Sequence, residues 1–174
     1  MSNATSGRRQ LRYLSILIGV CFLTSPIKVF AFSEKCIALL DAPVGNSHQK
    51  KVFQILKSNI KKCTSCEVKN FPIYEKNGDL KKSKFLSQIE SASKACRLLH
   101  LSWNTEFTVE YQEVVNALQS AIQQGHLIVA AAGAPSEGKI AAPIQQSVLG
   151  QVKDIILVGE LDSKNKLVIN SFFG

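Results

Sequence analysis

The chain has 174 residues, of which 45% are hydrophobic and 20% are charged. These proportions are typical of a folded globular domain and exclude a wholly disordered chain. Ten glycines and five prolines are too few for a collagen-like or low-complexity sequence. The formal net charge of +8 has to be read together with the N-terminal segment, which carries part of it.

The N-terminal segment has the pattern of an export signal. Arg8, Arg9 and Arg12 precede an apolar run at residues 13–23, and a small-residue site follows at Ala31. This run is short for a membrane-spanning helix, so we predict a signal peptide over residues 1–31 and an exported chain, periplasmic or secreted. Two alternatives stay open: an uncleaved segment that anchors the chain to a membrane, and export by the twin-arginine route.

The expected mature chain, residues 32–174, keeps 17 basic and 13 acidic residues. A balance of +4 is mild and predicts no nucleic-acid partner. Lysines gather at residues 50–62 and 81–84, which we interpret as solvated helix faces rather than a polyanion site.

Four cysteines remain in the mature chain: Cys36, Cys63, Cys66 and Cys96. An even number in an exported protein predicts two disulfides, and three connectivities are open. The Cys63–Cys66 spacing matches a CxxC motif, but it follows a predicted helix instead of starting one, as a reactive thiol would. A zinc site would need two further ligands at suitable spacing, so we predict no metal and no cofactor.

Strands and helices alternate along the mature chain. Short apolar runs predict strands, and apolar residues at helical spacing predict helices. In chain order, the predicted elements are a strand at 36–41, a helix at 47–62 with Ser47 as N-cap, a strand at 67–74, a helix at 83–95, a strand at 97–103, a helix at 114–122, a strand at 126–132, a strand at 154–161 and a candidate sixth strand at 167–172.

This alternation predicts an α/β fold of three layers, with a mostly parallel sheet of five or six strands and helices on both faces. In such sheets ligands bind beyond the carboxyl ends of the strands. The turns at 41–43, 102–104 and 133–135 are therefore the candidate site, and the cysteines should lie at the opposite edge.

Several segments resemble subtilisin-like serine proteases (subtilases). The sequence ALQSAIQQGHLIVAAAG at 117–133 is similar to that family's helix and following strand, which ends in AAAGN. Residues 154–162 resemble its next strand (VIAVGAVD), and residues 170–174 resemble its FSS-x-G turn. Residues 98–102 stand where the family has VINMS, and residues 37–41 resemble its VAVID strand. The resemblance covers about 130 residues in the correct order.

The resemblance implies that Asp41 matches the family's catalytic acid, while the rest of the machinery is missing. No histidine matches the base of the family's HGTHVAG motif: Gly45 would take the catalytic position, and His48 matches a non-catalytic one. The nucleophile's GTSMA motif has no counterpart, so the domain is expected to be incomplete, without its serine-bearing C-terminal part. Ala134 replaces the oxyanion-hole asparagine, a loss of roughly 3–4 kcal/mol of transition-state stabilisation.

The same comparison points to binding residues. Ser102 is followed by Trp103 and Asn104, where the family has small residues that pair with a peptide backbone. Trp103 is expected either to fill the specificity groove or core, or to act as an aromatic anchor for a partner. With Gly133 and Ala134, these residues form the predicted binding site.

We therefore predict an exported subtilase-like pseudoprotease that is catalytically inactive and binds a peptide or protein partner. Two alternatives stay open. One is an active serine-type endopeptidase or hydrolase, alone or completed by a partner chain. The other is an unrelated small-ligand-binding domain with a Rossmann-like sheet, although no glycine-rich phosphate loop is found.

Overall fold

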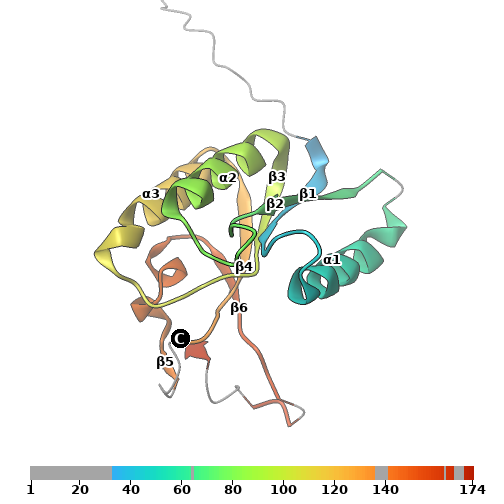
Figure 1. The fold of residues 1–174 in the computed structure, drawn as a ribbon. Helices are drawn as coiled ribbons and strands as arrows, with labels where there is room; N and C mark the ends of the chain where they lie inside the picture. The colour runs from blue at the N-terminus through green and yellow to red at the C-terminus, as the bar shows by residue number, and fades with distance from the viewer. Residues whose placement is uncertain (1–32, 64, 136–140, 163, 167–170) are drawn as a thin grey trace, which may run out of the picture.

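The computed structural model describes residues 33–63, 65–135, 141–162, 164–166 and 171–174. Its centre is a five-stranded sheet in which every neighbouring pair of strands is parallel (Figure 1). Across the sheet, the strands are β2 (Glu67–Pro72), β1 (Ser33–Asp41), β3 (Cys96–Leu101), β4 (Leu127–Ala131) and β6 (Ile156–Val158). The predicted parallel α/β fold is confirmed.

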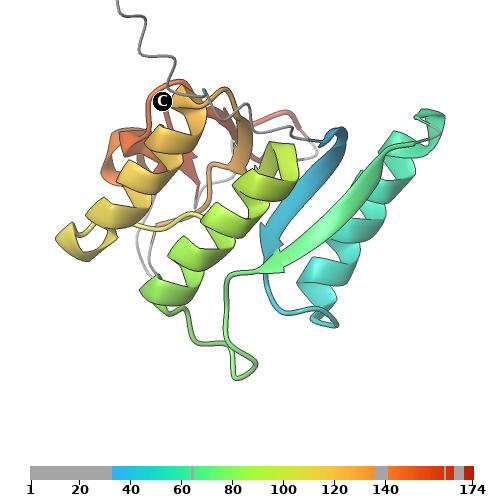
Figure 2. The ribbon, with the colours of Figure 1, turned by 90° about the horizontal axis from the view of Figure 1, so that it is seen from above.

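Helices cover both faces of the sheet, as the alternating pattern predicted. Figure 2 shows α1 (Ser47–Asn59) on one side and α2 (Lys82–Ala95) with α3 (Gln112–Gln123) on the other. A 3-10 turn, Ile60–Lys62, continues α1. The N-cap of α1 is Asn46, whose side-chain oxygen accepts a hydrogen bond from the His48 amide, so the prediction of Ser47 as the cap was wrong by one residue.

The main core lies between the sheet and the α2–α3 pair. Alternate residues along a strand face opposite sides, and Leu40 of β1 and Leu99 of β3 are fully buried on this side. Phe85 of α2 and Leu118 of α3 are equally buried against them. Burying one such side chain stabilises the fold by about 1.5–3 kcal/mol, so this layer fixes the positions of the strands.

The opposite face, where α1 lies, carries the polar groups of the candidate site. Because residues two apart in a strand face the same side, Asp41 and Leu39 of β1 share this face. Leu39 pairs with His100 of β3, so His100 lies on the same face. Leu39 is 1% exposed, whereas Leu127, Ile156 and Val158 are 47%, 47% and 56% exposed. Within the described part of the chain, α1 therefore shields β1 but leaves the outer positions of β4 and β6 open to solvent.

Two disulfides are present, as predicted, and the structure selects one of the three connectivities. Cys36 of β1 is bonded to Cys96 at the start of β3, and Cys63 is bonded to Cys66 ahead of β2. Both lie away from the carboxyl ends of the strands. This position supports a structural role for the Cys36–Cys96 disulfide, whose two cysteines are buried in the core at 2% and 0% exposure.

The C-terminal part departs from the prediction. β6 has three residues instead of the eight expected at 154–161. It begins at Ile156, two residues after Asp154, which adopts a left-handed backbone conformation (φ 62°), and it ends at Val158. The candidate sixth strand was expected at 167–172, and Phe172 at its end is not part of the main sheet. Instead β7 (Phe172–Phe173) pairs with β5 (Ala142–Pro143) in a separate two-stranded sheet, and residues 167–170 lie outside the described residues.

The predicted signal peptide, residues 1–31, also lies outside the described residues. Among the helices of the described part, none is long and apolar enough to span a membrane.

Candidate functional site

The carboxyl ends of β1 and β3 border a cavity of about 370 Å³. In a parallel sheet these ends meet at one edge, so residues distant in sequence come together there. The cavity is lined by Asp41, Ala42, Pro43, Asn46, His48, Tyr74, Gly78 and Ser102. Of the predicted site residues, Asp41 and Ser102 line this cavity.

Asp41 is the last residue of β1, and it is 2% exposed. Its Oδ1 accepts a hydrogen bond of 2.6 Å from the Ala42 amide, while Oδ2 has no hydrogen-bond partner. Burial raises the pKa of the Asp41 carboxyl above its ordinary 3.8, opposed by the Ala42 hydrogen bond and by the neighbouring His48, Ser102 and His100. The Ser102 hydroxyl is thus close to the carboxylate, but its geometry falls short of a hydrogen bond.

His48 stands beside Asp41, which the sequence analysis did not expect. Its Nε2 lies 3.7 Å from Asp41 Oδ1, and its side chain is 60% exposed. Only five residues separate β1 from α1, so the first turn of α1 is held directly over the end of β1. The comparison of motifs placed His48 in a non-catalytic position, and the short connection brings its side chain next to Asp41.

Ser102 continues β3 beyond its last residue and is paired with a histidine of its own strand. Its backbone amide donates to the Leu40 carbonyl (3.2 Å), and its Oγ lies 3.1 Å from His100 Nε2. The two side chains are two residues apart and so project from the same face. Burial lowers the pKa of His100, and the charge of Asp41 offsets this in part, so the imidazole favours its neutral form at neutral pH.

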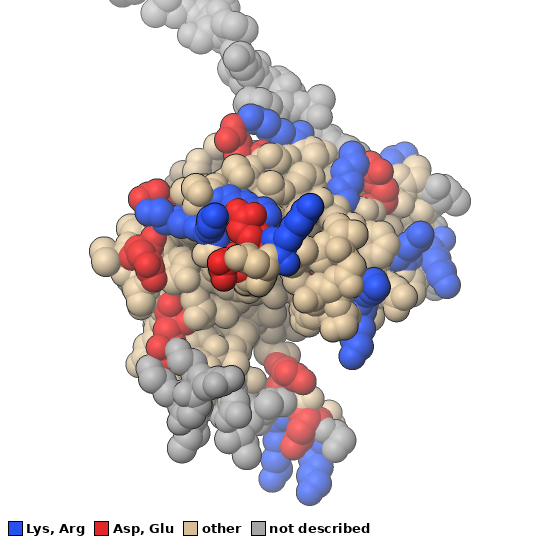
Figure 3. Space-filling view, in the orientation of Figure 1, with Lys and Arg blue, Asp and Glu red and all other residues tan. Residues whose placement is uncertain are grey.

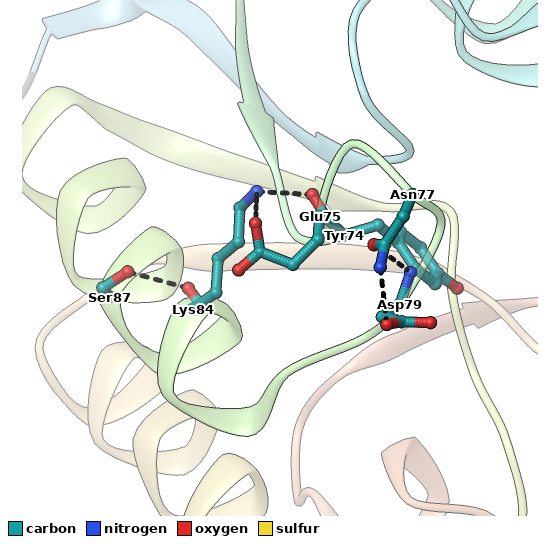
Figure 4. Close-up of polar contacts among 6 residues, drawn as sticks. All are labelled: Tyr74, Glu75, Asn77, Asp79, Lys84 and Ser87. Carbon is teal, nitrogen blue, oxygen red and sulfur yellow. Dashed lines mark hydrogen bonds and ion pairs between the residues drawn. The ribbon is translucent and has the colours of Figure 1, made fainter.

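The segment after β2 forms another wall of the cavity through Tyr74 and Gly78. Figure 4 shows the polar contacts made by this segment and by Lys84. Tyr74 and Leu80 form an isolated antiparallel bridge, which closes this segment into a tight loop. Lys84 of α2 anchors the loop: its ammonium donates to the Tyr74 carbonyl at 2.5 Å and lies 3.4 Å from Glu75 Oε2. Burial and then the charge of Asp41 raise the pKa of the Tyr74 phenol, which therefore stays protonated beside the carboxylate.

Trp103 is a core residue and does not face the cavity. It is 7% exposed, its ring meets Phe85 edge-on at 4.8 Å between centroids, and Tyr111 lies at 5.5 Å. Of the two roles considered for Trp103, the structure favours packing, and the buried indole is not accessible as an anchor for a partner.

Asn104 is equally occupied by the fold. Its amide nitrogen donates to the Ala132 carbonyl at 2.6 Å and to Ser147 Oγ at 3.0 Å. Its Oδ1 accepts from the backbone amides of Thr105 and Leu149. Both N–H groups of the side chain are used, so Asn104 ties the end of β4 to the segment before β6 and has no donor left for a ligand.

Gly133 and Ala134 follow β4 at the same edge. Gly133 has φ 72°, and a Cβ at this position would lie 2.7 Å from Asn104 Cβ, so glycine is required here. Ala134 is exposed and carries no side-chain amide. The resemblance implied an oxyanion-hole asparagine at the end of β4, and Ala134 stands at that position. The neighbouring Asn104 does not replace it, because both N–H groups of its side-chain amide are already used.

Sequence reasoning missed His48 and Tyr74 as members of the site. His48 follows the end of β1 by seven residues, and Tyr74 follows the end of β2 by two. The sequence does not say that β2 lies next to β1, which is what brings Tyr74 to the site. No group of three or more potential metal ligands occurs among the described residues. On the face shown in Figure 3, basic and acidic side chains are interspersed. Lys82 and Glu113 form one of the ion pairs of the described residues.

Comparison with known proteins identifies the fold and nothing finer. No protein family model matches the chain, and no curated protein matches its sequence. Among solved structures, the chain is similar to a cold adapted subtilisin-like serine proteinase, with a TM-score of 0.61 and 15% identity over 83% of this chain. The match spans 60% of the length of that proteinase. The chain therefore has a subtilisin-like fold, in agreement with the resemblance found in its sequence.

Proposed function

We propose that the protein is an exported, non-catalytic module with a subtilisin-like fold that binds a peptide or protein partner at the carboxyl-edge cavity. The observation that carries this proposal is the cavity itself, where a buried and incompletely paired Asp41 faces an open space of about 370 Å³. Incompletely paired polar groups in a concave site are typical of ligand recognition.

The absence of catalysis is supported by the surroundings of the Asp41–His48 pair. Acyl transfer needs a histidine oriented by the acid, a hydroxyl in reach of that histidine and donors for the oxyanion. The 3.7 Å separation is too long for a hydrogen bond, and the exposed imidazole is not held in place. The described serine that lines the cavity, Ser102, has its hydroxyl paired with His100 instead.

Export is supported by two features. The first is the signal-like pattern over residues 1–31, and the second is the pair of disulfides. Disulfides persist mainly in oxidising compartments, so the periplasm or the extracellular space suits the chain.

A second candidate function is a serine hydrolase, which the Ser102–His100 contact favours. A neutral imidazole 3.1 Å from a serine hydroxyl can accept its proton, and Asp41 lies close enough to stabilise the imidazolium that forms. This arrangement uses a different serine and a different histidine from those of the family that the sequence resembles.

A fluorophosphonate probe separates the two candidates. We expect the purified protein to remain unlabelled under conditions in which a known serine hydrolase is labelled completely. Labelling that disappears in Ser102→Ala but persists in Ser87→Ala, which changes a serine on the surface of α2, would overturn the non-catalytic proposal.

Binding is tested with a library of extended peptides presented to the immobilised protein. For the peptides retained, His48→Ala should weaken affinity at least tenfold, because the exposed imidazole lines the cavity. The matched control is Gln54→Ala, a change on the same helix away from the cavity, which should stay within twofold of the wild type. Retention of no peptide by the folded protein would contradict the proposal.

A further inference from the structure

We infer that the cavity receives a positively charged hydrogen-bond donor, an ammonium or guanidinium group, with Asp41 as its counter-ion. This inference rests on the proposed binding function and names the ligand chemistry of the same site. The cationic group has two possible sources in a peptide, its free N-terminus or a lysine or arginine side chain.

The first argument is the state of the Asp41 carboxylate. A carboxylate that is 2% exposed and accepts one backbone hydrogen bond has lost most of its hydration. Oδ2 has no hydrogen-bond partner, although it can accept two hydrogen bonds. Burial of a charge is costly unless the charge is paired and hydrogen-bonded, so the site gains most from a ligand that supplies both a positive charge and N–H donors.

The second argument is the set of charges around the cavity. Of the eight described residues that line it, Asp41 is the acid and none is lysine or arginine. Lys84, which anchors the neighbouring loop, is already bound to the Tyr74 carbonyl and to Glu75. The first turn of α1 has its His48 amide capped by Asn46, so this donor is also satisfied within the protein. The resident groups therefore leave the carboxylate without a full positive counter-charge.

The third argument is the remaining chemistry of the walls. Ser102 Oγ and the Tyr74 phenol oxygen can both accept a hydrogen bond, and an aromatic ring such as that of Tyr74 also favours a cation. A volume of about 370 Å³ accommodates one side chain or one peptide terminus. The imidazole of His48 lies 3.7 Å from Asp41 Oδ1 and is 60% exposed, so it has room to turn aside as a cation approaches the carboxylate.

The test uses calorimetric titration of the purified protein with four short peptides. Three are blocked at both ends and carry lysine, arginine or norleucine between two alanines. The fourth is a trialanine amide with a free N-terminus. We expect at least one cationic peptide to bind tenfold or more tightly than the neutral norleucine peptide. A preference for the trialanine amide assigns the N-terminus as the source, and a preference for lysine or arginine assigns the side chain.

Asp41→Asn removes the charge while keeping the size of the side chain and an acceptor for the Ala42 amide. In this variant the preference for cationic peptides should fall at least tenfold, with the norleucine peptide unchanged. Asp154→Asn is the matched control, because it makes the same change at an exposed residue outside the cavity, where its positive φ suits asparagine.

The outcomes separate this inference from the proposed function. Equal binding of the lysine, arginine, norleucine and trialanine peptides would overturn the cation inference. A preference for cationic peptides that persists in Asp41→Asn would overturn it as well. Both outcomes would leave the proposed peptide binding intact. Because the norleucine comparison uses the wild-type protein, the inference stays testable if the variant does not fold. Failure of every peptide, including the library, overturns both.

Discussion

Loss of the Cys36–Cys96 disulfide should lower the free energy of unfolding much more than loss of Cys63–Cys66. The first bond joins β1 to β3 across 60 residues, and the second closes a separation of three residues. In the chain-entropy description, a crosslink across 60 residues disfavours the unfolded chain by about 4 kcal/mol, against about 1.5 kcal/mol for three residues. Since a domain of this size has a total stability of roughly 5–15 kcal/mol, the larger effect is a substantial fraction of the whole.

The assay is urea unfolding of two double variants, Cys36→Ala with Cys96→Ala and Cys63→Ala with Cys66→Ala. The fluorescence of Trp103, the single tryptophan, reports the transition because this side chain is buried. Reduction of the wild-type protein provides the control, since it opens both bonds without removing the buried sulfur atoms. Equal losses in the two variants, or a larger loss from the Cys63–Cys66 pair, would refute the reasoning.

Three further predictions concern the site and its supports. Because burial raises the pKa of Asp41 above 3.8, the folded protein binds this proton more tightly than the unfolded chain, and stability should fall as pH rises through the interval above 3.8. Asp41→Asn should therefore raise the urea midpoint at pH 7 and remove that part of the pH dependence; an unchanged midpoint would contradict the assignment. Trp103→Ala should lower the free energy of unfolding in urea by about 3–5 kcal/mol, and Trp103→Phe should lower it much less. A change in ligand affinity without a loss of stability would argue against a core role for Trp103. Gly78→Ala should lower the free energy of unfolding by about 1–2 kcal/mol, because alanine is strained at the positive φ of this position. Gly133→Ala should lower it further in the same assay, because a Cβ there also meets Asn104. Similar losses in the two variants would show that the contact with Asn104 is relieved easily.

The layered architecture was predictable because it depends on local patterns. The apolar run at 36–41 ends at the last residue of β1, and the spacing of Phe85, Ile89 and Ala92 marks the buried face of α2. Such patterns reflect which face of an element is buried, and they are readable over a few residues. The C-terminal strands were predicted less well. The left-handed residue Asp154 lies where the strand was expected to begin, β6 ends three residues earlier than expected, and neither feature has a clear signal in the sequence.

The candidate site was predictable in part. Asp41 and Ser102 were expected at the carboxyl edge from the fold rule for parallel sheets, and both line the cavity. His48 was expected to have no role there, since reasoning by family motif placed it in a non-catalytic position. Trp103 and Asn104 were expected in the binding site, whereas the first is packed in the core and the second is engaged by backbone groups.

The sequence by itself determined the alternation of strands and helices, the four cysteines available for two disulfides, and the acid at the end of the first strand. Those features depend on residue type and on spacing along a few turns or one strand. The tertiary structure decided the strand order, which puts β2 and β3 on either side of β1 and so brings Tyr74 and Ser102 to Asp41. It also decided the pairing of the cysteines and the burial that raises the pKa of Asp41. These properties arise from contacts between segments tens of residues apart, whose energies depend on packing and desolvation rather than on any local pattern.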